Sequence, residues 1–183
     1  LNHDNRGDYL GEFSGDDKIL SINAVGYYEL MSYDLSNHFS DNLVLLEKFC
    51  SENVVVVIYY HGIKKHFYMK KFIIDNKSKK TLFIDNHKDS YLELVFIDAR
   101  NLIQLEFIKP RGKEKRPIEL IDPSVFMSVK GVSALGNQLS RYNIKNISLI
   151  EKKQDDLDLH SMDSLNLDQD SHDNLSSQIK LDF

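Results

Sequence analysis

Two short stretches of the sequence are rich in lysine and arginine, the side chains that bind phosphate groups. Residues 64–80 contain seven lysines and one acid, Asp75, and residues 109–116 contain five basic residues and one acid, Glu114. Such side chains neutralise phosphates without reading bases, so their binding is independent of sequence and sensitive to salt. With three further basic residues, the candidates for binding a polyanion are Lys64, Lys65, Lys70, Lys71, Lys77, Lys79, Lys80, Lys109, Arg111, Lys113, Lys115, Arg116, Lys130, Arg141 and Lys145.

A basic stretch can also be an ordinary solvated surface, and composition alone gives that interpretation the same weight as phosphate binding. The chain has no tryptophan, and Tyr68 is the aromatic residue that lies among the lysines. Base stacking, the usual means of holding single strands, is therefore not indicated. The backbone of duplex DNA is the preferred polyanion.

Other chemistry has little support in the sequence. Asp16 and Asp17 resemble a metal-binding pair, but neighbouring strand residues point to opposite faces, so a polar turn is expected. The seven histidines show no metal-ligand spacing, and no glycine-rich phosphate loop is present. His61 and His66 are expected at the surface, and the single cysteine, Cys50, is expected to be a buried thiol. The sequence predicts no metal site and no autonomous active site.

The first basic stretch begins in a predicted β-hairpin that spans residues 54–72. Val54–Tyr60 is a continuous apolar run, which is typical of a strand covered on both faces. His61-Gly62 predicts the turn, because glycine accepts a positive φ. The return strand alternates and would present a basic face formed by Lys64, His66, Tyr68 and Lys70.

Similar hairpins are expected on either side of this one. The first joins Ile19–Ala24 to Tyr27–Leu35, and the third joins Tyr91–Ile97 to Leu102–Ile108. Their turns lie about 36 to 38 residues apart, a period typical of propeller-like blades, although a generic antiparallel sandwich stays open. The remaining predicted strands are Leu43–Cys50 (or a short helix), Thr81–Asp85, Pro117–Ile121, Phe126–Val129 and Ile144–Glu151.

The charge divides the chain into a body and a tail. Residues 1–153 hold 22 basic and 20 acidic residues, giving +2, whereas residues 154–183 hold Lys180 and eight aspartates, giving −7. The tail also lacks a hydrophobic pattern, so we expect a disordered acidic segment. One hypothesis is that these aspartates compete with DNA for the basic residues.

Three segments, GDYLGEFSGDDKILSINAVGYYEL, LEKFCSENVVVVIYYHGIKKHFYMKKF and FMSVKGVSALGNQLSRYNIKNISLIE, carry a family resemblance. They resemble the C-terminal region of the A subunit of type IIA bacterial topoisomerases, topoisomerase IV rather than DNA gyrase. The resemblance spans roughly residues 7–153. It implies a β-pinwheel whose basic rim binds or bends duplex DNA. Residues 130–139 are the nearest stretch to the glycine-rich basic box of gyrase and have a single basic residue, which argues against gyrase-like wrapping.

The resemblance therefore implies an all-β, partial or reduced β-pinwheel of about three blades over residues 1–153, followed by the tail. The family's catalytic tyrosine belongs to a preceding winged-helix domain, so none of the tyrosines here takes that role and the fragment is not expected to cleave DNA. ATP and Mg²⁺ would be bound elsewhere in the parent enzyme, and no cofactor is expected in this fragment.

The expected partners are duplex DNA and, through the rest of the parent chain, the ATPase B subunit. The C-terminal sequence QIKLDF is similar to peptides that dock on the bacterial sliding clamp, with Gln178, Ile179, Leu181 and Phe183 at the matching positions. A cytoplasmic, nucleoid-associated location without membrane contact fits this interpretation. The rival interpretation is a propeller-like protein-interaction module whose basic face meets an acidic partner.

Overall fold

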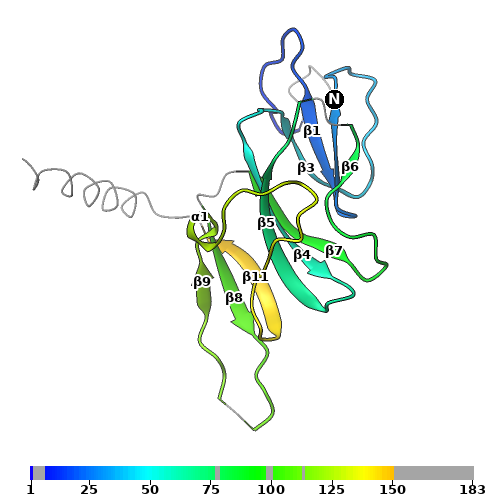
Figure 1. Ribbon diagram of the computed structural model, residues 1–183. Coiled ribbons are helices and arrows are strands. Elements are labelled where there is room, and N and C mark those ends of the chain that lie inside the picture. The colour runs from blue at the N-terminus through cyan, green and yellow to red at the C-terminus, as the bar shows by residue number, and fades with distance from the viewer. Residues whose placement is uncertain (2–6, 77–78, 98–100, 113, 151–183) are drawn as a thin grey trace, which may run out of the picture. The chain divides into compact units, whose positions relative to one another are not determined.

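The chain folds into short antiparallel strands that form three sheets (Figure 1). The computed structural model describes residues 1, 7–76, 79–97, 101–112 and 114–150, and within these no helix is long and apolar enough to cross a membrane. Residues 1–150 form one compact unit. The prediction of an all-β fold is confirmed, whereas the predicted disordered tail at 154–183 lies outside the described residues.

The first sheet has the strand order β3-β1-β2-β6. Its strands are β1 (Ile19–Asn23), β2 (Tyr27–Met31), β3 (Leu43–Lys48) and β6 (Thr81–Leu82). The predicted hairpin β1–β2 is confirmed, and the ambiguous stretch after residue 42 forms a strand. Gly26 turns this hairpin at φ +89°, and a Cβ there would overlap the Ile84 side chain.

The second sheet has the order β10-β5-β4-β7 and contains the central hairpin. Its strands are β4 (Val54–His61), β5 (His66–Ile73), β7 (Tyr91–Ile97) and β10 (Asn137–Gln138). The β4–β5 register runs from Val54 opposite Ile73 to His61 opposite His66, as a hairpin requires. The positive φ of its turn lies at Lys65 (55°) and not at Gly62, so that part of the prediction is wrong. Gly62 is needed for space, because a Cβ there would overlap the His87 ring.

The third sheet has the order β11-β8-β9, with β8 (Leu102–Phe107), β9 (Glu119–Ile121) and β11 (Ile144–Ile150). The prediction that β7 and β8 form a hairpin is wrong, because β7 pairs with β4 whereas β8 pairs with β9 and β11. Alternation identifies a strand but not its neighbour.

The strand predicted at residues 126–129 is also wrong, because the chain forms a one-turn helix, α1 (Pro123–Phe126), that ends at residue 126, and no strand follows at 127–129. The Asp122 carboxylate caps this helix by accepting the Ser124 amide at 2.8 Å, and proline occupies its first turn. An aspartate followed by proline is typical of a helix start, and this signal prevails over the short apolar run that suggested a strand.

Two hydrophobic cores hold the three sheets together. Core 1 joins residues of the first and second sheets, including Ile22, Tyr28 and Phe72, and core 2 joins the second and third sheets, including Met69 and Leu105. Strand β4 contributes to both, with Val55, Val57 and Tyr59 in core 1 and Val56 and Ile58 in core 2. Its continuous apolar run is therefore explained by burial on both faces.

Strands β6 and β10, here called crossing strands, link neighbouring sheets. Strand β6 follows β5 in the chain but pairs with β2 in the first sheet, and β10 follows β9 but pairs with β5 in the second sheet. Each of the first two sheets therefore receives a strand from the repeat that follows it. Three successive, interlocked sheets are compatible with a partial β-pinwheel.

Two side chains lie in the opposite environment to that expected. Cys50 is exposed, because β3 ends at Lys48 and the thiol falls in the following turn region. His61 is only 7% exposed, because the turn of the central hairpin packs against residues 87–90. Whether a residue at a strand end is buried depends on which distant segment packs against it, and the local sequence does not show this.

Candidate nucleic-acid interface

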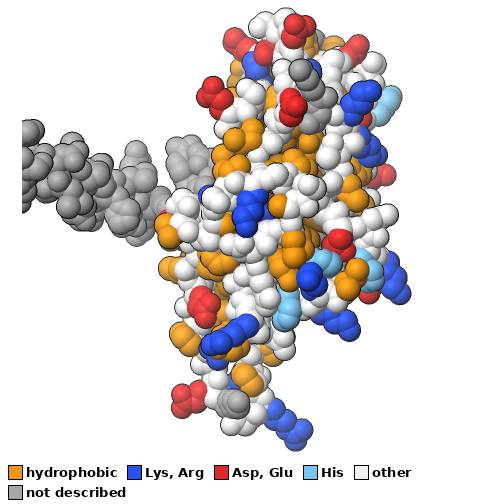
Figure 2. Space-filling view, viewed as in Figure 1, with side chains coloured by type: hydrophobic (Ala, Val, Ile, Leu, Met, Phe, Trp, Pro, Cys, Tyr) orange, Lys and Arg blue, Asp and Glu red, His pale blue; other side chains and the backbone are white. Residues whose placement is uncertain are grey.

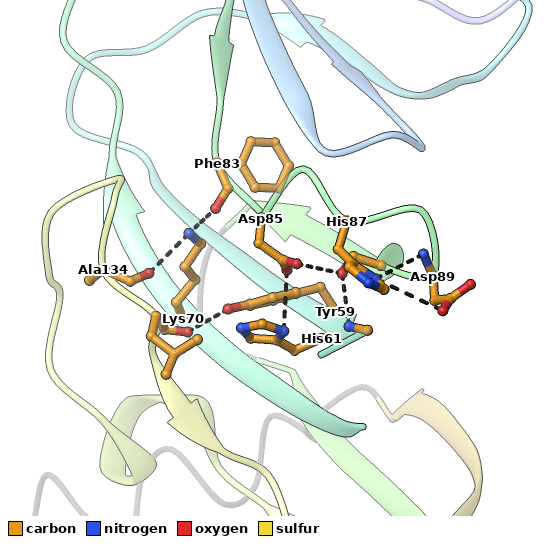
Figure 3. Close-up of polar contacts among 11 residues, drawn as sticks. Tyr59, His61, Lys70, Phe83, Asp85, His87, Asp89 and Ala134 are labelled. Carbon is orange, nitrogen blue, oxygen red and sulfur yellow. Dashed lines mark hydrogen bonds and ion pairs between the residues drawn. The ribbon is translucent and has the colours of Figure 1, made fainter. Parts of the chain in front are cut away.

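Two lysines of the first basic stretch, residues 64–80, are buried inside the fold. Lys70 is 2% exposed and Lys71 is 6% exposed, so the prediction that they belong to a DNA-facing surface is wrong. The Lys70 ammonium group donates to the carbonyl oxygens of Phe83 and Ala134, the latter at 3.1 Å (Figure 3), and to that of Val132 at 2.8 Å. The Lys71 ammonium group donates to the Pro123 carbonyl at 2.8 Å. The reason is that β5 lies in a sheet that is covered on both faces, so its alternation does not produce an outer side.

The surroundings of Lys70 are largely apolar. Its ammonium group lies within 5.6–5.8 Å of three aromatic ring centres, those of Tyr59, Phe72 and Phe83. Burial lowers the pKa of Lys70 from 10.5 to about 8, and the negative charge of Asp85 partly opposes that shift. Lys70 therefore links β5 to the segments around residues 83 and 132–134, and its ammonium group is not available to bind phosphate.

The turn of the central hairpin carries the lysines of this stretch that do reach solvent. Lys64 and Lys65 are exposed, and the amide of Lys65 closes the turn by donating to the His61 carbonyl at 2.7 Å. The Gly62 amide donates to the Ser90 hydroxyl at 2.8 Å, which holds residues 87–90 against the turn. That segment adds exposed Lys88, which the sequence analysis missed because it lies outside both basic stretches.

A polar cluster lies beneath this turn (Figure 3). The Ser90 hydroxyl donates to the Asp85 carboxylate at 2.7 Å, and the other carboxylate oxygen lies 3.6 Å from His61 Nδ1. The Ser90 hydroxyl thus bridges the Gly62 amide and the Asp85 carboxylate, and the cluster fixes the turn.

The best-organised basic surface surrounds Tyr142 on the third sheet. The Arg116 guanidinium carbon lies 3.2 Å from the centre of the Tyr142 ring, and that of Arg141 lies 5.0 Å from it. The ring packs edge-on against Phe107 of core 2, with 6.0 Å between the ring centres. One anchored ring therefore positions two guanidinium groups, as cation–π contacts favour.

Two exposed lysines flank this ring along the chain. The Ile108 amide donates to the Asn143 carbonyl at 2.9 Å, which brings the loop after β8 next to the start of β11. Lys109 follows that contact directly, and exposed Lys145 sits at the irregularity where the β11–β8 register shifts. We call the set of Lys109, Arg116, Arg141 and Lys145 the Tyr142 cluster. The sequence analysis did not identify Tyr142 as the ring that positions these arginines, and its only signal in the sequence is the neighbouring Arg141.

The other predicted basic residues are exposed at separate places. Lys80 lies 3.9 Å from the Tyr27 ring centre, Lys115 lies 3.9 Å from the Glu106 carboxylate, and Lys130 lies 3.2 Å from the Asn137 side-chain oxygen. Lys79 and Arg111 are exposed, whereas Lys77 and Lys113 lie outside the described residues, as do Gln178, Ile179, Leu181 and Phe183. Figure 2 shows Lys and Arg side chains at several points on the visible face, with hydrophobic side chains between them.

The carboxylate pair near the N-terminus forms the polar turn that was expected. The Asp17 carboxylate accepts the Ser14 amide at 2.9 Å and lies 2.7 Å from the Lys48 ammonium group. These two contacts lower the pKa of Asp17, the hydrogen bond with Lys48 most strongly. Within the described part of the chain, no three His, Cys, Asp or Glu side chains gather closely enough to hold a metal ion.

Comparison with known proteins gives one match. The family model for the topoisomerase C-terminal domain of Bacteroidota matches residues 1–152, which is most of the chain. No curated protein and no solved structure matches the chain.

Proposed function

Because the chain belongs to the topoisomerase C-terminal domain family, we propose that it binds duplex DNA as a non-catalytic domain of a type IIA topoisomerase A subunit, of the topoisomerase IV kind. The observation that carries this proposal is the Tyr142 cluster, where two guanidinium groups are held over one ring and two exposed lysines flank it. Such an array suits the DNA backbone, which is read through charge and not through base edges.

The geometry also supports a role for Tyr142 in affinity. Stacking on an anchored ring restricts the arginine side chains before binding, so less rotamer freedom is lost when they meet phosphates. If all four residues of the Tyr142 cluster contact phosphates, the slope of log K against log salt is about −3.6, from roughly −0.9 for each contact. Raising salt from about 50 to 200 mM then weakens binding by about 150-fold.

In the parent enzyme this domain would hold or bend one duplex and so position it for passage through the catalytic gate. The chemistry would belong to other parts, with ATP bound by the B subunit and Mg²⁺ at the cleavage site. A cytoplasmic location on the nucleoid follows from the same proposal. What supports this placement is the family membership together with the separate exposed basic residues.

The proposal is tested by measuring duplex binding by fluorescence anisotropy over a salt series. We expect sequence-independent binding, and the double variant Arg116→Gln/Arg141→Gln should reduce the salt slope by about 1.8. The matched control is Lys18→Gln, just before β1, where the lysine donates to the Asn76 carbonyl beside the acidic turn and lies outside the proposed surface. Its slope should equal that of the wild type.

Absence of duplex binding at about 50 mM salt would contradict the proposal and favour the rival function, a module that binds an acidic protein partner. Binding that the double variant leaves unchanged would keep DNA binding but move it away from the Tyr142 cluster. Lys64 and Lys65 at the turn of the central hairpin would then be the next surface to test.

The C-terminal peptide supports a separate partner proposal, docking on the sliding clamp through Gln178, Ile179, Leu181 and Phe183. This proposal rests on the sequence match alone. A synthetic peptide of residues 177–183 should bind purified clamp, and the Phe183→Ala peptide should not. Absence of binding at high micromolar peptide would end it.

A further inference from the structure

The two crossing strands are bonded in the same way. Strand β6 pairs with the start of β2, and the amide of the next residue, Phe83, donates to the Gly26 carbonyl at 2.8 Å. Strand β10 pairs with β5, and the amide of its next residue, Leu139, donates to the Phe67 carbonyl, also at 2.8 Å. A crossing strand is thus two paired residues followed by one large apolar residue.

The apolar residue goes to the same place in both repeats. Phe83 is 2% exposed and belongs to core 1, between the first and second sheets. Leu139 is 4% exposed and belongs to core 2, between the second and third sheets. Each crossing strand therefore extends one sheet and fills the layer between that sheet and the next.

Within the part of the chain that the structure describes, the third sheet repeats this plan without a crossing strand. Strand β11 pairs with β8, as β3 pairs with β1 and β7 pairs with β4. Strand β9 corresponds to β2 and β5, yet among the residues that the structure describes its only strand partner is β8. The N–H and C=O groups on the outer edge of β9 therefore have no strand partner among the described residues, whereas the equivalent groups of β2 and β5 pair with a crossing strand.

The face next to this edge carries exposed apolar side chains among polar ones, and no other described strand packs on it. Ile103 and Leu105 point into core 2, so Leu102 and Gln104 lie on the opposite face. Leu120 is paired with Gln104 and Ile150 is paired with Leu102, so both lie on that face as well. Leu120 is 57% exposed and Ile150 is 36% exposed. We call this surface the outer face. It corresponds to the faces that Phe83 and Leu139 cover in the other repeats.

We propose that the β9 edge binds an extended segment of a partner protein by strand addition. By analogy with β6 and β10, two residues of the segment pair with Glu119 and Leu120, and the next amide donates to the Ile118 carbonyl. The third residue, a phenylalanine or leucine, packs on the outer face. Main-chain bonds supply the attachment and the apolar side chain supplies the selectivity, as in other strand-addition complexes.

A second copy of this chain fits the edge less well. Both of its crossing strands are already paired within their own chain. Its β9 strand would offer Ile121 as the apolar residue, and that side chain already packs against core 2. A second copy is thus disfavoured, and we assign the segment to a different protein.

The test uses the full chain, labelled with ¹⁵N, and a synthetic peptide that copies its own crossing strand, Lys-Lys-Thr-Leu-Phe-Ile from residues 79–84. We expect amide shifts confined to residues 118–121 and the outer face, with half-saturation on the order of 1 mM for so short a peptide. The same peptide with Phe83→Asp should lose at least tenfold in affinity.

The protein variant for this test is Leu120→Lys, which changes an exposed side chain and should abolish the shifts while duplex binding stays unchanged. Its control is Val44→Lys, on an exposed position of β3 that is 48% exposed, and it should bind the peptide normally. A failure of the proposed DNA function would appear in the duplex assay alone, so the two proposals fail separately.

Three results would overturn this inference. The first is the absence of shifts at residues 118–121 with about 5 mM peptide. The second is a dimer in light scattering that Leu120→Lys dissociates, which would assign the edge to a second copy. The third is slow hydrogen exchange at the outward amides of β9 in the monomer without peptide, which would show that the edge is already paired by its own chain.

Discussion

The buried ammonium group of Lys70 makes the stability of this domain depend on pH in a direction that can be calculated. The unfolded chain has a lysine pKa near 10.5, whereas burial lowers the folded-state pKa to about 8. Between these values the unfolded chain holds a proton that the folded chain has released. Stability therefore rises with pH through this window, and below about pH 8 the contribution is constant.

The size of the effect follows from the two pKa values. At pH 7 the lowered folded-state pKa reduces the free energy of unfolding by about 3 kcal/mol relative to a lysine whose pKa is the same in both states, and at pH 9.5 this reduction is about 1.4 kcal/mol. Raising the pH from 7 to 9.5 should thus add about 2 kcal/mol of stability that belongs to Lys70 alone. Lys70→Met removes the titrating group while keeping a side chain of similar length.

The assay is urea unfolding of the wild type and of Lys70→Met at several pH values, with the difference in free energy of unfolding plotted against pH. Other titrating groups are common to both proteins and cancel in this difference. Lys130→Met, an exposed lysine, reports the effect of removing one charge. A wild-type advantage that stays flat or falls between pH 7 and 9.5 would refute the reasoning, because it would mean that the three carbonyls stabilise the charged form against burial.

Two further predictions concern single positions. Gly136→Ala should lower the free energy of unfolding, measured by urea, by about 2 kcal/mol or more, because Gly136 has φ +87° and its added Cβ would overlap the Met69 carbonyl. The control is Gly131→Ala, whose Cβ would meet open space and which should change the free energy of unfolding by less than about 0.5 kcal/mol. Tyr142→Leu keeps an apolar side chain against core 2 but removes the ring under Arg116, so duplex affinity should fall by about three- to tenfold while the melting temperature changes little.

The strands could be predicted from the sequence because their signals are local. Continuous apolar residues in β4 and alternation in β8 reflect how each face of a strand is covered, and glycine at position 26 marks a turn that needs it. The resemblance to a topoisomerase C-terminal region was confirmed, because three segments in order carry more information than any single hairpin.

The sheet partners and the buried lysines could not be predicted, because both depend on distant segments. The crossing strands β6 and β10 have two residues each, which is too short for any periodic signal. Lys70 is polar in the sequence, but its burial is decided by carbonyls from residues 83, 132 and 134. The Tyr142 cluster likewise joins residue 116, which precedes β9, to residues 141 and 142, which precede β11.

The position of Lys70 also bears on what kind of segment the β9 edge can accept. Its carbonyl partners follow β6 in the chain or precede β10, where irregular backbone carbonyls need donors, and an ammonium group supplies three. The equivalent residues are Glu29 in β2 and Ile121 in β9, and neither donates from its side chain. Strand β6 nevertheless pairs with β2, so a crossing strand does not require the ammonium group. A segment added to β9 would be held as β6 is, by its main-chain bonds and by its apolar third residue, and those are the two features that the peptide test varies.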